Sequence, residues 1–153
     1  MGSTSNKRIV LIAIRPRFAE SIIKGEKKVE FRKVRFREKV SHVVIYASKP
    51  IQRILGYFQV PNIAEDSPEH LWARYHYVSG MRYDEFRNYY ASSDKGIAIE
   101  VGNIWQLKKP VPISKLDKSI ITPQSFAYLT HEIFEMIRRR YASVPIFKVA
   151  PSP

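Results

Sequence analysis

The stretch Gly25-Glu26-Lys27-Lys28-Val29-Glu30-Phe31-Arg32 marks the point at which a helix gives way to a strand. Before it lies an amphipathic segment, Pro16 to Lys24, whose proline suits the first position of a helix. Gly25 suits the left-handed residue just past the helix end. After this glycine the hydrophobic period becomes alternating. We therefore predict a short helix over residues 16–24 that turns directly into a strand.

The predicted strand has one apolar and one charged face, because alternate side chains of a strand point to opposite sides. Val29 and Phe31 face a core. The other face carries a row of cation, anion and cation about 6–7 Å apart, formed by Lys28, Glu30 and Arg32. Two cations beside a carboxylate offer donors to a phosphate or a base edge. The structural alternative is a solvated edge strand with ion pairs.

The stretch resembles the Gly-x-Lys-x-x-Glu-x-Arg signature of the ASCH family, whose small barrels are related to the PUA domain. Further motifs follow in the family's order, so the similarity covers most of the chain, residues 8–128. They are the strand Ile9 to Ile14, the helix residues Ala19, Glu20 and Ile22, the run Val43 to Pro50, Ile54-Leu55-Gly56, Ser93-Asp94-Lys95-Gly96 and Pro123-Gln124-Ser125-Phe126. The resemblance implies an α+β fold: a small PUA-like mixed β-barrel closed by helices.

The pattern of the whole chain predicts one domain, residues 8–142, between a flexible N-terminus (1–7) and a proline-containing tail (143–153). The predicted elements alternate too irregularly for a doubly wound sheet. They are strands over 8–14, 27–32, 42–47, 52–60 and 95–105, a basic loop over 33–39, a tyrosine-rich helical insertion over 62–92, an extended connection over 108–112, and a C-terminal helix that opens at Thr122-Pro123. Gly56, inside a strand, indicates a bulge, a tight corner or a close approach.

Composition favours a polyanionic partner. The 153 residues carry a net charge of +12, with 44% hydrophobic and 12% aromatic residues, enough for a packed core. Between Lys24 and Lys39, eight basic side chains face three acidic ones, and Arg138-Arg139-Arg140 is a second basic cluster. Such charge attracts polyanions. The plain alternative is a generally basic proteome.

Several function classes are not expected. The chain has no cysteine, which excludes disulfides, thiolate metal sites and a cysteine nucleophile. The four histidines (His42, His70, His76 and His131) lack ligand spacing, so we expect no metal. Phosphate-loop and Gly-x-Gly-x-x-Gly motifs are missing, so we expect no cofactor. Without a signal core or an apolar run near about 20 residues, we expect a cytoplasmic protein without a membrane partner.

The resemblance implies RNA as the partner, because ASCH domains are generally proposed to bind RNA, often near translation or transcription assemblies. We expect single-stranded RNA or a nucleotide in a basic cleft around Gly25–Arg32. The expected nucleic-acid contacts are Lys27, Lys28, Glu30, Arg32, Lys33, Arg35, Arg37, Tyr46, Ser48 and Lys49. Alternation sets Lys27 opposite Glu30, whereas the family places both in the cleft. We favour the motif, because a residue near a glycine can sit in a turn.

Whether the cleft is catalytic stays open. One alternative is a metal-independent ribonuclease in which Glu30 is the base and Lys27 stabilises developing negative charge. Another is a hydrolase of a modified nucleoside, because some ASCH proteins hydrolyse N4-acetylcytidine. Those enzymes pair the motif lysine with a threonine where Glu30 stands, and they use a later glutamate, for which Glu100 is the candidate here. When nothing is bound, we expect Glu30 to pair with Arg32 or Lys27, so that the carboxylate orients the cations.

Overall fold

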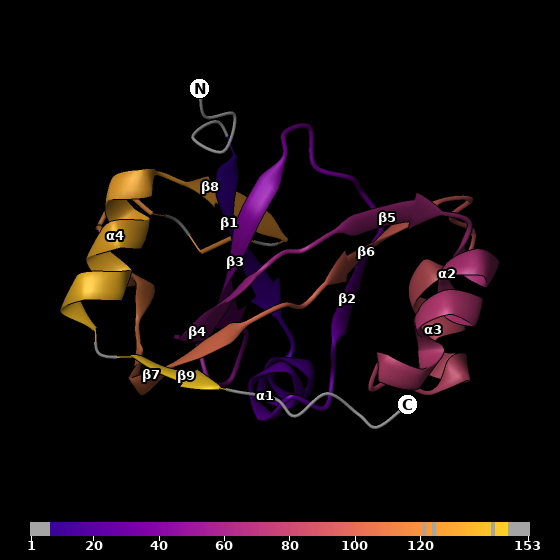
Figure 1. Ribbon diagram of the computed structural model, residues 1–153, viewed down its shortest axis with the longest axis horizontal. Helices are drawn as coiled ribbons and strands as arrows, with labels where there is room; N and C mark the ends of the chain where they lie inside the picture. The colour runs from indigo at the N-terminus through magenta and orange to yellow at the C-terminus, as the bar shows by residue number, and fades with distance from the viewer. Residues whose placement is uncertain (1–6, 121, 124, 142, 147–153) are drawn as a thin grey trace.

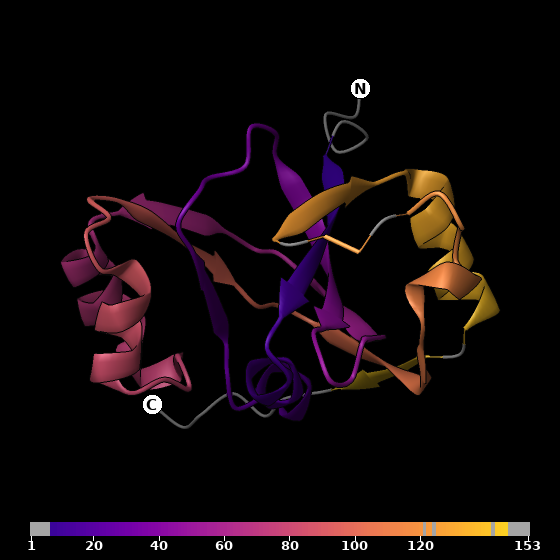
Figure 2. The same cartoon turned by 180° about the vertical axis from the view of Figure 1, so that it is seen from behind.

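The computed structural model describes residues 7–120, 122–123, 125–141 and 143–146. The predictions for residues 1–6 and 147–153 lie outside this part of the chain. Within it, strands form two sheets and four α-helices pack on them, so the α+β class is confirmed (Figures 1 and 2). In chain order the elements are β1 (Arg8–Ile14), α1 (Pro16–Lys24), β2 (Val29–Arg32), β3 (Val40–Ala47), β4 (Arg53–Gln59), β5 (Ile63–Asp66), α2 (Pro68–Tyr75), the 3-10 turn η2 (His76–Val78), α3 (Tyr83–Tyr90), β6 (Gly96–Glu100), β7 (Ile104–Val111), the 3-10 turn η3 (Ile113–Lys115), β8 (Phe126–Leu129), α4 (His131–Arg140) and β9 (Ser143–Ile146).

The larger sheet has the strand order β8-β1-β3-β4-β7-β9, and the smaller has the order β2-β6-β5. β1 and β3 run parallel, while the other pairs are antiparallel. In the described residues neither sheet closes on itself, because β8 and β9 are edges of the larger sheet. The barrel implied by the family resemblance is therefore not confirmed. The observed architecture is an open mixed sheet beside a small antiparallel one.

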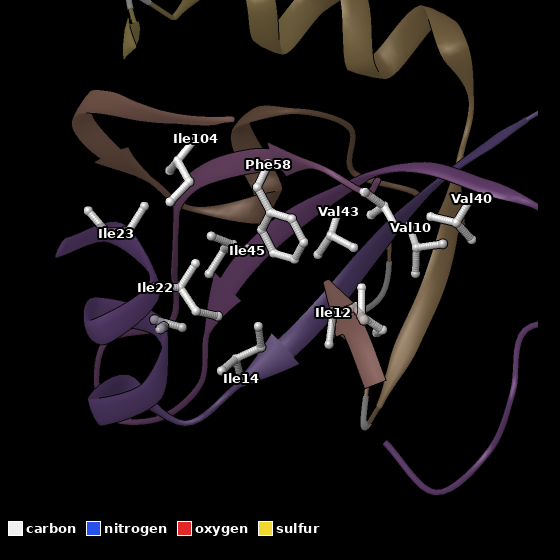
Figure 3. Close-up of a cluster of buried hydrophobic side chains, with 14 of the residues drawn as sticks. Val10, Ile12, Ile14, Ile22, Ile23, Val40, Val43, Ile45, Phe58 and Ile104 are labelled. Atoms are coloured by element: carbon white, nitrogen blue, oxygen red, sulfur yellow. The ribbon is translucent and has the colours of Figure 1, made fainter. Parts of the chain in front are cut away.

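Both faces of the larger sheet are buried. On one face α1 packs Ile22 and Ile23 against strand residues that include Ile45 (Figure 3). On the other face α4 contributes Phe134 and Ile137 to a second core. Burial on both faces explains why β1 and β3 are nearly continuous apolar runs. It also fixes α1, and with it the turn into β2.

The helical insertion expected within residues 62–92 is confirmed. α2 and α3 pack on the smaller sheet, where the Phe31 and Phe86 rings lie 4.8 Å apart edge to face. β5 was not expected, because it is only four residues long and ends directly before the N-cap of α2. Its last residue, Asp66, pairs with Gly96 of β6, so the insertion leaves and rejoins the sheet at neighbouring positions. α2 and α3 lie at one end of the molecule, away from α4 (Figure 1).

Gly56 marks both a bulge and a close backbone approach, as expected. The register of β4 shifts at this point against β3 and against β7. A Cβ on Gly56 would lie 2.2 Å from the carbonyl oxygen of Trp105. Only a glycine lets β4 and β7 approach this closely.

The predicted start of the last helix is wrong. Residues Phe126–Leu129 form β8, which pairs with β1, and the helix begins only at His131. Thr130, and not Thr122, is the N-cap: its hydroxyl accepts a hydrogen bond from the N–H of Ile133 at 3.1 Å. A run of four residues fits both the helical and the strand period. Pairing with the buried strand β1 therefore determines that these residues form a strand.

The strand predicted over 95–105 is two strands in different sheets. β6 ends at Glu100 and β7 begins at Ile104, so residues 101–103 carry the chain from the smaller sheet to the larger. The connection expected over 108–112 is mostly the end of β7. Residues Ser143–Ile146, expected in the tail, form β9 and extend the larger sheet. Non-local pairing decides each of these points.

Candidate functional site

A cleft of about 550 Å³ opens where the end of β1, α1, β2 and the helical insertion meet. Side chains from all four segments line it. They are Ala13, Ile14, Arg15, Phe18, Lys27, Glu30, Phe31, Arg32, Ser48, Met81, Glu85, Asn88 and Tyr89. Three motif residues expected in a cleft, Lys27, Glu30 and Arg32, therefore line one cleft together.

Lys27 reaches this cleft from the turn after α1. Gly25 ends the helix in the left-handed conformation, with φ of 83°, and Lys27 lies before the first residue of β2. Its side chain is 1% exposed; Nζ donates to the carbonyl oxygen of Ser79 at 2.6 Å and lies 4.7 Å from the Phe18 ring centroid. Lys27 thus lines the cleft with Glu30 from a turn, outside the strand alternation.

Burial lowers the pKa of Lys27 below its usual value. The carboxylate of Glu30 opposes this effect, Arg17 adds to it, and Glu85 opposes it. Desolvation is the largest cause, so the ammonium is less stable here than on a surface. A lysine of this kind both presents positive charge and releases its proton more easily than an exposed one.

Glu30 and Arg32 form an ion pair on the charged face of β2. Nη1 of Arg32 lies 3.1 Å from Oε2 of Glu30, and Nη2 donates to Oγ of Ser125 at 2.8 Å. Nη1 also lies 3.4 Å from the carbonyl oxygen of Ala13. A guanidinium held from three sides keeps a fixed orientation toward the cleft. Of the two partners expected for Glu30, the structure gives it Arg32.

One wall of the cleft was not predicted from the sequence. Met81, Glu85, Asn88 and Tyr89, which form this wall, come from the tyrosine-rich insertion. Arg17 of α1 forms an ion pair with Glu85 that ties this wall to the helix before the motif. The tyrosine-rich composition of the segment could have indicated a role at the site. The position of the segment beside the motif could not be predicted, because it depends on the pairing of β6 with β2.

The basic loop after β2 is confirmed, and its cations are exposed. Nζ of Lys33 lies 4.9 Å from the ring centroid of Tyr89, which brings the start of the loop to the rim of the cleft. Arg35 is 3.8 Å from Glu65 in a weak surface ion pair, and Arg37 is exposed. The loop therefore adds exposed positive charge beside the cleft.

Four other expected contact residues lie in different settings. Ser48 lines the cleft. Tyr46 is 3% exposed in the core under α4, on the opposite face of the larger sheet, and the cleft does not include it. The backbone N–H of Lys28 donates to the carbonyl oxygen of Val78 at 2.8 Å, while its half-buried side chain lies outside the cleft lining. Lys49 is exposed beyond Ser48.

Glu100, the candidate second glutamate of a hydrolase, lies away from the cleft. Its Oε2 accepts a hydrogen bond from the Tyr75 hydroxyl at 2.6 Å and lies 3.7 Å from Nη2 of Arg74. Burial, which is the larger cause, and this hydrogen bond raise the pKa of Tyr75 to about 12. Glu100 faces α2 because its register partner is Val29, whereas Glu30 is paired with Ile99.

Membrane-spanning helices and clusters of metal-ligating side chains are both absent from the described residues. No helix there reaches the length and apolarity that a membrane crossing needs. The same residues contain no cluster of three or more His, Asp or Glu side chains arranged to hold a metal ion.

Comparisons with known proteins agree with the motif. The model of the family described as "Domain of unknown function (DUF365)" matches residues 9–122. The ASCH domain-containing ribonuclease of Zymomonas mobilis is 25% identical over 136 residues, which cover 86% of this chain and 91% of the relative. The resemblance to the ASCH family is therefore confirmed.

Solved structures show the same fold. The crystal structure of ASCH from Zymomonas mobilis aligns with a TM-score of 0.81 at 23% identity, covering 88% of this chain and 96% of the other. The N-terminal domain of Staphylothermus marinus McrB aligns with a TM-score of 0.59 at 14% identity, covering 88% and 94%.

Proposed function

Because this chain belongs to the DUF365 family and has the fold of ASCH proteins, we propose that it binds single-stranded RNA and holds one nucleotide in the cleft around Gly25–Arg32. The similarity to a protein named as a ribonuclease supports RNA as the ligand class. The net charge of +12 supports a polyanion.

One observation carries the proposal: a guanidinium fixed in orientation stands among aromatic side chains in a cleft of nucleotide size. Arg32 is held by Glu30 and Ser125, so its remaining donors suit a phosphate or a base edge. Phe18 and Tyr89 supply ring surfaces for a base. A splayed base from a single strand fits this combination better than a duplex does.

The basic loop explains how RNA would be attracted. Lys33, Arg35 and Arg37 are exposed and follow the motif directly. Exposed cations contribute affinity that depends on salt and hardly on sequence. The cleft then discriminates among bases, and the loop sets the overall affinity.

A salt titration with labelled single-stranded RNA tests the proposal. The variant Arg32→Ala should weaken binding about tenfold or more, because a hydrogen bond to a charged group is lost. The double variant Arg35→Ala with Arg37→Ala should reduce the slope of log Kd against log salt by about 1.4. Lys109→Ala removes an exposed cation of β7 and serves as the control. Absence of binding at low salt would refute the proposal.

A metal-independent ribonuclease is the second candidate, favoured by the carboxylate of Glu30 and the ammonium of Lys27, which line one cleft, and by the lowered pKa of Lys27. Glu30 is then the candidate base, and Lys27 the group that stabilises developing negative charge. Purified protein is incubated with an RNA pool and, separately, with N4-acetylcytidine. Turnover that Glu30→Gln or Lys27→Ala abolishes supports an enzyme, and equal turnover in all three proteins indicates contamination.

A further inference from the structure

A second groove lies on the other side of the Arg17–Glu85 ion pair. It has a volume of about 660 Å³ and runs between α1 and the turn that joins α2 to α3. Its lining residues come from α1 and the turn after it, and from the segment that runs from η2 to the first turn of α3. They are Arg17, Phe18, Glu20, Ser21, Lys24, Glu26, His76, Tyr77, Gly80, Met81, Arg82 and Glu85.

This second groove is continuous with the cleft. Phe18, Met81 and Glu85 line both spaces. The pair between Arg17 and Glu85 stands at the boundary, and the side chain of Arg17 is largely exposed. An exposed ion pair of this kind contributes little to stability, so a ligand that displaces it loses little. A ligand that fills the cleft can therefore extend into the second groove past this pair.

Tyr77 gives the second groove an aromatic surface in contact with water. It is 77% exposed, the largest exposed fraction among the big apolar side chains of the described residues. Its ring lies edge to face with the neighbouring His76 ring, with 6.0 Å between the centroids, and its high exposure leaves ring surface open to a ligand. Aromatic rings held in this way are the usual platform on which proteins stack unpaired bases.

Charge in the second groove is balanced. Three cations, Arg17, Lys24 and Arg82, face three carboxylates, Glu20, Glu26 and Glu85. Glu85 is further engaged, because its Oε1 accepts a hydrogen bond from the backbone N–H of Arg82 at 3.1 Å. A groove without net charge does not gather phosphates as the basic loop does. It suits an uncharged, planar group with polar edges, such as a nucleobase.

We infer that the second groove is a subsite for the base next to the one in the cleft, with Tyr77 as its stacking platform. This inference rests on the proposed RNA binding and makes it more specific. The cleft then holds a nucleotide inside a strand, and a free mononucleotide is only part of the ligand. The neighbouring base contributes through stacking and little through charge.

A length series of RNA oligonucleotides, from a mononucleotide to a tetranucleotide, tests this subsite. Wild type should bind the dinucleotide about tenfold more tightly than the mononucleotide, from the stacking of one further base. Tyr77→Ala should lose this gain and leave mononucleotide affinity and the salt slope unchanged. Tyr77→Phe should keep it. Tyr83→Ala, which removes another exposed tyrosine of the insertion outside the second groove, is the matched control.

The two proposals fail in different ways. If Arg32→Ala changes the binding of no RNA in the series, the cleft proposal is refuted. If Arg32→Ala weakens binding but Tyr77→Ala leaves the gain from the second base intact, only the subsite is refuted. The subsite is also refuted if Tyr77→Ala loses the same affinity for the mononucleotide as for the tetranucleotide, or if it changes the salt dependence of binding.

Discussion

Nζ of Lys27 donates a hydrogen bond to the carbonyl oxygen of Ser79 at 2.6 Å, which joins the motif to the turn of the helical insertion. A backbone bond from Lys28 to Val78 runs beside it. Gly80, with φ of 64°, turns the chain just after the acceptor and leaves room for the lysine stem. The ammonium at the cleft is therefore a fixed structural link as well as a charge.

The first prediction concerns stability against pH in the variant Lys27→Met. Burial lowers the pKa of Lys27 below 10.5, so between that lowered pKa and 10.5 the unfolded chain binds more protons than the folded one. The free energy of unfolding of wild type, relative to the variant, should rise with pH in this window. Each unit by which the pKa is lowered is worth about 1.4 kcal/mol.

Urea unfolding of both proteins from pH 7 to 11 measures this difference. Lys24→Met, at an exposed position of α1, is the control and should follow wild type. A Lys27→Met curve parallel to wild type across the whole range would contradict the lowered pKa.

The second prediction compares two buried hydroxyl groups. The hydroxyl of Tyr90 lies 3.0 Å from the carbonyl oxygen of Arg32 and 3.2 Å from that of Ile97, and it fixes the motif strand to α3. Among the described residues the buried hydroxyl of Tyr128 has no partner. Tyr90→Phe should lower the free energy of unfolding by about 1–2 kcal/mol, and Tyr128→Phe should leave it unchanged or raise it. Chemical denaturation checks the order of the two variants, and the reverse order would refute the assignment.

The third prediction ranks two glycines. Gly56→Ala should cost at least about 3 kcal/mol, because the new Cβ meets the backbone oxygen of Trp105 and neither strand can retreat. Gly25→Ala should cost about 1–2 kcal/mol, the strain of a left-handed residue. Thermal unfolding of both variants measures the ranking. A milder effect at Gly56 would mean that β4 and β7 separate more easily than the structure indicates.

The fourth prediction concerns the selectivity of the cleft. In Glu30→Ala, Arg32 loses the carboxylate that orients it, and the cleft becomes more positive. Non-specific affinity for RNA should stay level or rise, while discrimination among RNAs falls. If Glu30 instead accepts from a base amino group, affinity for one preferred sequence should fall by about 1–3 kcal/mol. Selection of bound RNAs with both proteins separates these cases, and an unchanged preference would mean that Glu30 has a structural role only.

Local sequence was enough to predict the start of the fold and the floor of the cleft. Pro16, Gly25 and the change of period after it specify α1 and the turn into β2 without help from distant residues. The family motif brought Lys27, Glu30 and Arg32 to one cleft. Simple alternation alone would have separated Lys27 from the other two.

Non-local pairing determined what the sequence could not predict. Phe126–Leu129 is a strand because β1 offers it an edge, although its spacing also fits a helix. Tyr46 was expected at the cleft, but the alternation of a sheet buried on both faces sends it under α4. The wall that carries Tyr89 comes from residues 81–89, far along the chain from the motif. No local pattern contains such contacts.

The pairing of Asp66 with Gly96 has an evolutionary consequence. The segment between them supplies a whole wall of the cleft, yet its two ends are neighbours in one antiparallel ladder. A hairpin end of this kind accepts a different length of chain without moving the strands that it joins. The strands at the floor of the cleft can thus stay unchanged during evolution while the segment that forms the wall changes in length and sequence. A replacement segment must still supply an acceptor for the buried ammonium of Lys27, the role that the carbonyl oxygen of Ser79 has here.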